Sequence, residues 1–281
     1  MLANPSSLKN AGLFYLLVMT LSLALVLFFR ITAPQTDLVI PINMLTPFLA
    51  TVIMLVVVTR EGYARDGRAT LGLGRSGVRS WGLALLLPLP VLLASYGLGW
   101  WSGIAALVPP AEEDWLPKLL IRLPVRLPMA VLLALGEEIG FRGYLFPHLL
   151  ELGPKRAAIL SGFLHGTWHL PLILLTPFYL TEGNPLITIP IFLLLFTAAG
   201  AIYGWLRLGT NSIWPPSILH GAFNAFLDIF TRLTLFTSPL AVYFVGESGV
   251  LTFLATAAVA FWFLRRRSMD PAAADYPMAA A

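Results

Sequence analysis

The chain has 281 residues, of which 58% are hydrophobic and only 11% are charged. Its mean hydropathy of +0.81 lies far outside the range of soluble globular proteins and is typical of proteins that cross a membrane several times. Cysteine is absent, which excludes disulfides, Cys-ligated metal sites and thiol nucleophiles. We therefore predict an all-α bundle of transmembrane helices without a sizeable soluble domain.

Eight hydrophobic stretches are long enough to cross a bilayer. They lie at residues 11–31, 38–58, 81–101, 127–150, 156–176, 186–206, 212–234 and 241–264. The first stretch has full spanning length and no cleavage site of small residues behind a short apolar region, so we interpret it as a retained helix. The sequence thus predicts about eight transmembrane helices.

The basic residues indicate the orientation of these helices. If the N-terminus is cytoplasmic, twelve Lys and Arg residues fall in inside segments and five in outside segments. This asymmetry predicts that both termini are inside, in the plasma membrane if the source is prokaryotic. The formal charge of +4 is therefore a matter of topology, and we expect the lipid bilayer, not a nucleic acid, as a partner.

Three regions follow from this pattern. Residues 1–126 hold the first three helices, a basic inside loop and an outside segment, 102–126, that is either amphipathic and interfacial or a plain loop. Residues 127–234 hold helices four to seven. Residues 235–281 hold the last helix and a tail, after Arg267, that has no periodicity and is predicted to be disordered.

Three charged residues interrupt the fourth predicted helix: Glu137, Glu138 and Arg142. A charged side chain at the centre of a bilayer costs about 3 kcal/mol on insertion scales. Three uncompensated charges would cost roughly 8 to 9 kcal/mol, which is comparable to the stability of a whole domain. They must therefore face protein or water and have partners.

Polar side chains also recur four residues apart, on one helix face, in three predicted helices. The pairs are Glu138 with Arg142, His165 with His169, and His220 with Asn224. Counted from the inside end of each helix, Glu137, His169 and Asn224 lie 13 or 14 residues deep, which is roughly 20 Å at the rise of an α-helix. Independent structural bonds would have no reason to share one level, so we predict a single polar site.

Two chemistries suit such a site. A desolvated carboxylate beside an imidazole can activate water, and His220 and Asn224 can hold the oxyanion of an attacked carbonyl, which is peptide hydrolysis. Alternatively Glu137, His169 and His220 hold a zinc ion with water as the fourth ligand. The residue types alone leave both open.

Other classes have less support. The sequence contains no HExxH or GxGD motif, and its one GxSG string, at residues 74–77, lies in the basic loop. A proton-coupled transporter would use the same buried Glu and His as a relay, but no internal repeat supports it.

Three motifs resemble those of the CPBP family of intramembrane proteases, which includes the type II CAAX prenyl endopeptidases (Rce1-like) and the Abi proteins of bacteriocin processing and immunity. EEIGFRGYL at residues 137–145 looks like the family's EExxxR motif, GTWHLP at residues 166–171 is similar to its second motif, and ILHGAFN at residues 218–224 is similar to its HxxxN motif. Their order and helical context agree across residues 127–234.

The resemblance implies a membrane-embedded peptidase in which Glu137 and His169 activate water and His220 and Asn224 form the oxyanion hole. Glu138 and Arg142 would support this first motif. The family is often labelled metalloprotease, but the resemblance favours a metal-free glutamate mechanism, so no cofactor is expected and zinc remains the alternative. At the position four before His169 the family usually has an aromatic residue, whereas this chain has His165, for which we expect a structural or supporting role.

The expected substrate is a peptide or protein, and the family's eukaryotic substrate is a prenylated C-terminal CAAX peptide. The alternative function, from the Abi relatives, is bacteriocin self-immunity by binding a peptide without cutting it.

Overall fold

The structure, a computed structural model, describes residues 5–63, 68–112, 114–179 and 182–265. The predicted disordered tail lies outside these residues. Helices make up nearly all of the regular structure, which confirms the predicted all-α membrane bundle. The α-helices are α1 (Pro5–Thr32), α2 (Val39–Asn43), α3 (Thr46–Ile53), α5 (Trp81–Leu86), α6 (Pro88–Ser102), α7 (Trp115–Glu138), α8 (Phe146–Leu149), α9 (Pro154–Trp168), α10 (Leu170–Leu175), α11 (Pro185–Thr210), α12 (Trp214–Arg232), α13 (Ala241–Phe244) and α14 (Val250–Leu264).

Shorter helical segments extend several of these helices. Two are π-helices, η1 (Met54–Val58) and η4 (Ile139–Leu145), and three are 3₁₀-helices, η2 (Glu61–Tyr63), η3 (Val78–Ser80) and η5 (Leu150–Leu152). The segment η4 follows α7 directly, so helical backbone runs without a break from Trp115 to Leu152. π-Turns inside α-helices are rare and are frequent at functional sites.

Six helical runs of the described residues are long and apolar enough to cross a membrane. They are Ser7–Thr32, Val39–Val58, Val78–Ser102, Trp115–Leu152, Pro154–Leu175 and Pro185–Thr210. They coincide with the first six predicted spans. The seventh predicted span is α12, and the eighth is divided into the short α13 and the 15-residue α14.

Residues 102–126 differ from both alternatives that the sequence left open. Their beginning forms β1 (Ala105–Leu107), which pairs antiparallel with β2 (Thr234–Phe236), and Trp115 already starts α7. The apolar and basic residues from Trp115 onward therefore belong to the same helical run as the fourth predicted span, which is about four turns longer than predicted. No separate interfacial helix is seen among the described residues of this segment.

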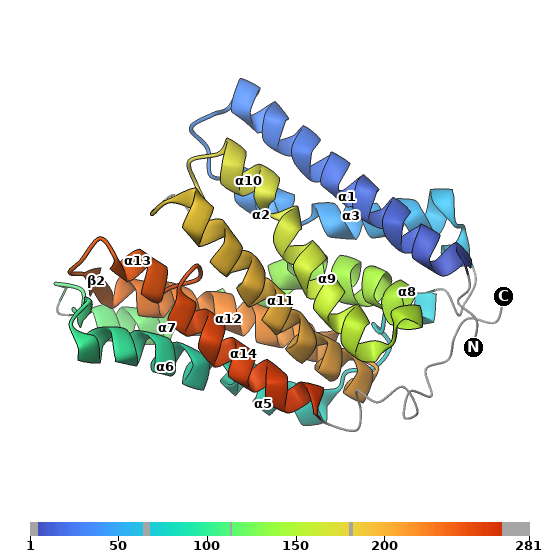
Figure 1. Cartoon of the computed structure of the whole chain (residues 1–281). Helices are drawn as coiled ribbons and strands as arrows, with labels where there is room; N and C mark the ends of the chain where they lie inside the picture. Colours follow the sequence, from blue (N-terminus) through green and yellow to red (C-terminus); the bar gives the residue numbers. More distant parts are fainter. Residues whose placement is uncertain (1–4, 64–67, 113, 180–181, 266–281) are drawn as a thin grey trace.

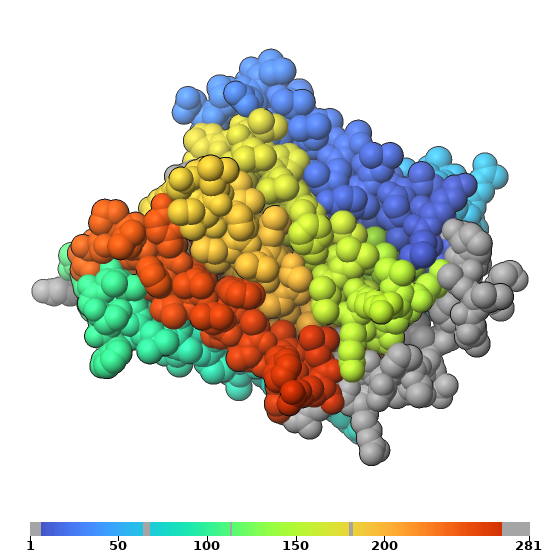
Figure 2. Space-filling model, in the orientation of Figure 1, coloured from blue at the N-terminus to red at the C-terminus, as the bar shows by residue number. Residues whose placement is uncertain are grey.

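α11 runs through the middle of the bundle, with α9 on one side and α14 on the other (Figure 1). α7 and α12 pack against each other, and α1 and α3 cover the other edge. α11 and α14 lie side by side on the face that Figure 2 shows. Both helices expose apolar side chains, since Leu194 of α11 and Phe261 of α14 are about half exposed. Such a surface is suited to lipid.

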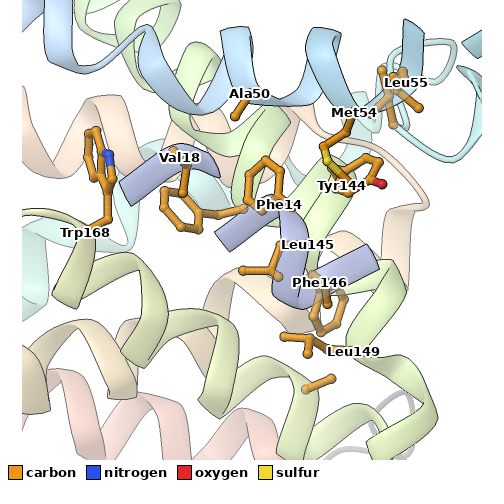
Figure 3. Close-up of a cluster of buried hydrophobic side chains, with 14 of the residues drawn as sticks. Phe14, Val18, Ala50, Met54, Leu55, Tyr144, Leu145, Phe146, Leu149 and Trp168 are labelled. Carbon is orange, nitrogen blue, oxygen red and sulfur yellow. The ribbon is translucent and has the colours of Figure 1, made fainter. Parts of the chain in front are cut away.

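A large apolar cluster locks η4 against α1, α3 and α9. Phe14 of α1 lies between Phe141 and Tyr144 of η4, with ring centroids 6.3 and 5.2 Å away. Figure 3 shows Phe14 and Tyr144 close to Met54 within this cluster. The packing fixes η4, and with it the residues of the EExxxR motif, on one side of the bundle.

Glycines bring the helices that carry the site unusually close. A Cβ atom on Gly221 of α12 would lie 2.5 Å from the Cα atom of Val131 in α7, and one on Gly162 of α9 would lie 2.4 Å from the carbonyl oxygen of Phe196 in α11. No side chain fits at either place. The close contact of α7 with α12 is what lets residues of the first and third motifs meet.

Candidate active site

The site begins where α7 gives way to the π-helix η4. Glu137 and Glu138 are the last two residues of α7, and their exposed fractions are only 1% and 0%. Arg142, in η4, is also completely buried. Three ionisable groups thus lie in the interior, as the sequence required, and each needs a partner to offset its desolvation.

Arg142 connects two of the three predicted helices. Its Nη1 atom donates to Oε1 of Glu138 at 3.0 Å and to Nδ1 of His165 at 2.6 Å, and its guanidinium lies 4.4 Å above the ring of Tyr203. Nη1 has two hydrogens, so both are used. The predicted pair of Glu138 with Arg142 is present, and Arg142 also holds His165.

The hydrogen bonds of His165 determine its tautomer. An arginine can only donate, so Nδ1 of His165 accepts and the ring hydrogen is on Nε2. Nε2 lies 2.7 Å from Oε2 of Glu137 and donates to it. The ring of His165 stacks on that of Phe141, with centroids 4.2 Å apart and planes at 17°. His165, and not His169, is therefore the histidine that directly holds Glu137.

His169 presents a free nitrogen to the site. It caps the end of α9, and its Nδ1 donates to the carbonyl oxygen of His165 at 3.1 Å, which leaves Nε2 with its lone pair. A ring nitrogen of His169 lies within 4.8 Å of a carboxylate oxygen of Glu137. The rings of Trp168, Tyr179, Phe192 and Phe196 surround it.

His220 of α12 lies between the two glutamates. Its Nδ1 donates to Oε1 of Glu138 at 2.9 Å, and its Nε2 lies 4.0 Å from Oε2 of Glu137. Asn224, one turn further along α12, lines the same cavity as His220. The prolines Pro215 and Pro216 in the first turn of α12 suit a helix start, because proline lacks the N–H that has no partner there.

The cavity beside His220 is narrow and mainly apolar. About 40 Å³ of it is open to the centres of water molecules, which is room for two or three waters. Its polar lining consists of Tyr203, His220, Asn224, Glu247 and Thr256. The remaining lining residues are aliphatic and aromatic, so a water or a peptide carbonyl here meets few polar groups.

The donor atoms do not fit a three-ligand zinc site well. Those of Glu137, His165 and His169 lie within 4.8 Å of one another, but Nε2 of His165 carries a hydrogen and has no lone pair to offer. The zinc ligands predicted from the sequence are Glu137, His169 and His220, with His220 in the place of His165. Nε2 of His220 is 4.0 Å from Oε2 of Glu137, whereas ligands about 2.1 Å from one tetrahedral zinc lie about 3.4 Å apart.

The structure thus brings six of the seven predicted site residues into one hydrogen-bonded or closely packed group, and Asn224 adjoins it across the cavity. Two residues of the surroundings were not predicted. Arg207, counted among the inside basic residues, is buried and donates Nε to the carbonyl oxygen of Arg142 at 3.2 Å. Glu247 was overlooked within the eighth predicted span, although a single charge in an apolar stretch is the signal that revealed Glu137.

The comparison with protein families gives a match that covers this site. Residues 119–226 match the family model of the type II CAAX prenyl endopeptidases, Rce1-like. These residues form an Rce1-like domain. The match contains every predicted site residue from Glu137 to Asn224, while Glu247 lies beyond it. A search of the curated proteins gave no match.

The Rce1-like match and the six apolar helices indicate an integral, multi-pass membrane protein. The match also indicates a membrane peptidase of the CAAX-protease type, which acts on a peptide or protein at the membrane. The predicted resemblance to the Rce1-like endopeptidases is confirmed over residues 119–226, and the buried group of glutamates and histidines lies within this domain.

Proposed function

We propose that the protein is an intramembrane endopeptidase in which Glu137 is the general base and no metal takes part. The observation that carries this proposal is the completely enclosed Glu137 carboxylate, held by the Nε2 hydrogen of His165 and faced by Nε2 of His220. A desolvated carboxylate with fixed hydrogen-bond partners is poised to accept a proton from water. Nε2 of His169 would accept the second hydrogen of that water and orient it.

In the proposed reaction, the water oxygen attacks the carbonyl carbon of the peptide bond while its proton passes to Glu137. The resulting oxyanion is held by the side-chain amide of Asn224 and by Nε2–H of His220. Since Nδ1 of His220 already donates to Glu138, a hydrogen on Nε2 makes His220 an imidazolium between two carboxylates. Glu137 then returns its proton to the leaving amine, and the C–N bond breaks.

This assignment gives the two adjacent glutamates different roles. Glu138 shares Oε1 between Arg142 and His220 and so fixes the charge and orientation of the histidine. Glu137 faces the reacting water. His165, the departure from the family pattern, would hold Glu137 in place and so has a positioning role.

The test is to compare Glu137→Gln and His169→Ala with the unchanged protein. The peptides of membranes that contain each variant would be identified by mass spectrometry, which also names the substrates. Loss of the general base lowers the rate by about 10²–10⁴-fold, so Glu137→Gln should release no new termini. His169→Ala leaves the water without its second acceptor and should also abolish cleavage. Asp228→Asn, on the exposed part of α12, is the matched control and should cleave normally. Normal cleavage by Glu137→Gln would refute the proposal.

The metal alternative has its own test. Cleavage by the purified protein should persist after exhaustive chelation, and the protein should contain no stoichiometric zinc. Loss of activity on chelation, with recovery on addition of zinc, would instead establish the zinc-dependent version. A peptide-binding function of the Abi type would survive Glu137→Gln, because binding needs no base.

A further inference from the structure

The loop between α13 and α14 brings a carboxylate to the active site from outside the matched domain. α13 ends at Phe244 and α14 begins at Val250, so residues 245–249 leave the helical path inside an otherwise apolar stretch. Gly246 has a φ of +93°, a backbone conformation that other residues rarely adopt. The loop places Glu247 in the wall of the cavity, together with His220 and Asn224.

Glu247 is tied to the second motif through a tyrosine. The hydroxyl of Tyr179 donates to Oε1 of Glu247 at 2.8 Å, across 68 residues of sequence. The ring of Tyr179 stacks on that of His169, with centroids 5.6 Å apart and planes at 25°. A chain of contacts therefore runs from Glu247 through Tyr179 to His169.

His169 needs such a support. Its Nδ1 bond is to the backbone of its own helix, at the last turn of α9, and this single bond leaves the ring free to swing about it. The ring plane is therefore set by the aromatic rings packed around it. Two of these rings have their own orientation fixed by a hydrogen bond, namely Trp168, whose Nε1 donates to Thr46, and Tyr179, while Phe192 and Phe196 are held by packing alone. Tyr179 is the one of the two whose hydrogen-bond partner lies in the cavity wall.

We propose that Glu247 is a positioning residue of the active site, which acts through Tyr179 to hold the ring of His169 toward the water that Glu137 activates. The catalytic consequence of this inference rests on the proposed function. The positioning of the His169 ring by Tyr179 and Glu247 does not. Because the carboxylate also lines the cavity, a direct contact of Glu247 with substrate is the competing explanation. The two differ in what the carboxylate must provide, namely a hydrogen-bond acceptor for Tyr179 or a charge.

The experiment uses the full-length protein in detergent and five variants: Tyr179→Phe, Glu247→Ala, Glu247→Gln, the double variant Tyr179→Phe with Glu247→Ala, and the control Glu112→Ala. Glu112 is exposed and pairs only with Lys118 among the described residues. Cleavage kinetics would be measured with a substrate found in the peptide comparison. In parallel, ¹⁵N-histidine labelling gives the ring signals of only four histidines. His148, bonded to the carbonyl oxygen of Tyr144, is the internal reference.

We expect Tyr179→Phe and Glu247→Ala each to lower kcat about tenfold with little change in KM, because each removes the same hydrogen bond. The double variant should be no slower than either single variant. Glu247→Gln should recover most of the activity lost in Glu247→Ala, since the amide oxygen also accepts from the tyrosine. The ring signals of His169 should shift in Tyr179→Phe, with those of His148 unchanged.

Three outcomes would overturn the proposal. The first is unchanged kcat and His169 signals in both single variants. The second is a double variant as slow as the product of the two single effects. The third is a Glu247→Gln variant as impaired as Glu247→Ala, which would indicate that the charge acts directly. If the unchanged protein cleaves nothing, the proposed function fails, and the histidine signals alone still decide whether Tyr179 and Glu247 position His169.

Discussion

Two pairs of a carboxylate and a guanidinium, both with the spacing i and i+4, mark opposite ends of the contact between α7 and α12. At one end Glu138 and Arg142 have no exposed side-chain surface, and at the other Asp228 and Arg232 have 44% and 63% exposed. Both acids also reach across to the neighbouring helix, Glu138 to His220 and Asp228 to Arg126. The residue types and spacing are the same, and only burial differs.

This difference explains why one end is a site and the other is not. Exposed ion pairs contribute little, because water solvates the separated charges nearly as well. Buried charges depend on every partner, since an uncompensated charge in the interior costs several kcal/mol. At the buried end the orientation of each side chain is therefore fixed by its hydrogen bonds, as the proposed reaction requires.

The largest difference in stability and cleavage is expected between variants of the two arginines. Arg142→Met should destabilise the protein by about 3–5 kcal/mol and abolish cleavage, because it leaves Glu138 buried without its cation. Arg232→Met should change stability by less than about 1 kcal/mol and leave cleavage intact. Unfolding in detergent and peptide cleavage would be measured for both. Equal effects would show that burial does not distinguish the two pairs.

A smaller effect is expected from the histidines. His165→Phe keeps the ring that stacks on Phe141 but removes the acceptor of Arg142 and the donor to Glu137, so the rate should fall about tenfold or more. His148→Phe loses a bond to the carbonyl oxygen of Tyr144 and a 3.8 Å contact with the carboxylate of Glu61, both outside the site, and should cleave normally. Unimpaired cleavage by His165→Phe would mean that Glu137 needs no support from this position.

The smallest effect on stability and cleavage is expected from a change at the contact between α7 and α12. Gly221→Ala should cost about 1–3 kcal/mol and slow cleavage, because its methyl group would meet the backbone of Val131 and move His220 away from Glu138. Gly97→Ala, in α6, has open space and should be neutral or up to about 1 kcal/mol more stable. Thermal unfolding and the cleavage rate would be compared. If the two variants behave alike, the close approach of α7 and α12 is not what joins the motifs.

The features that the sequence predicted correctly are those that depend on residues close together along the chain. A membrane span is formed by about 20 consecutive apolar residues, so its position can be predicted without knowing the tertiary structure. The pairing of Glu138 with Arg142 follows from the helical period alone. By contrast, the start of the fourth span at Trp115 and the division of the eighth were missed, because strand pairing and the loop with Glu247 depend on distant neighbours.

The sequence by itself determined the class of protein and the predicted residues of the candidate site, because charged residues in an apolar stretch are rare and the helical period is a short-range rule. Its three motifs carried the resemblance to the family. Only the tertiary structure decided which partner each group has. His165 instead of His169 contacts Glu137, and Glu138 is shared by Arg142 and His220. These choices depend on how closely α7, α9 and α12 approach and on which ring nitrogen carries the hydrogen, and neither is set by the residues of one helix alone.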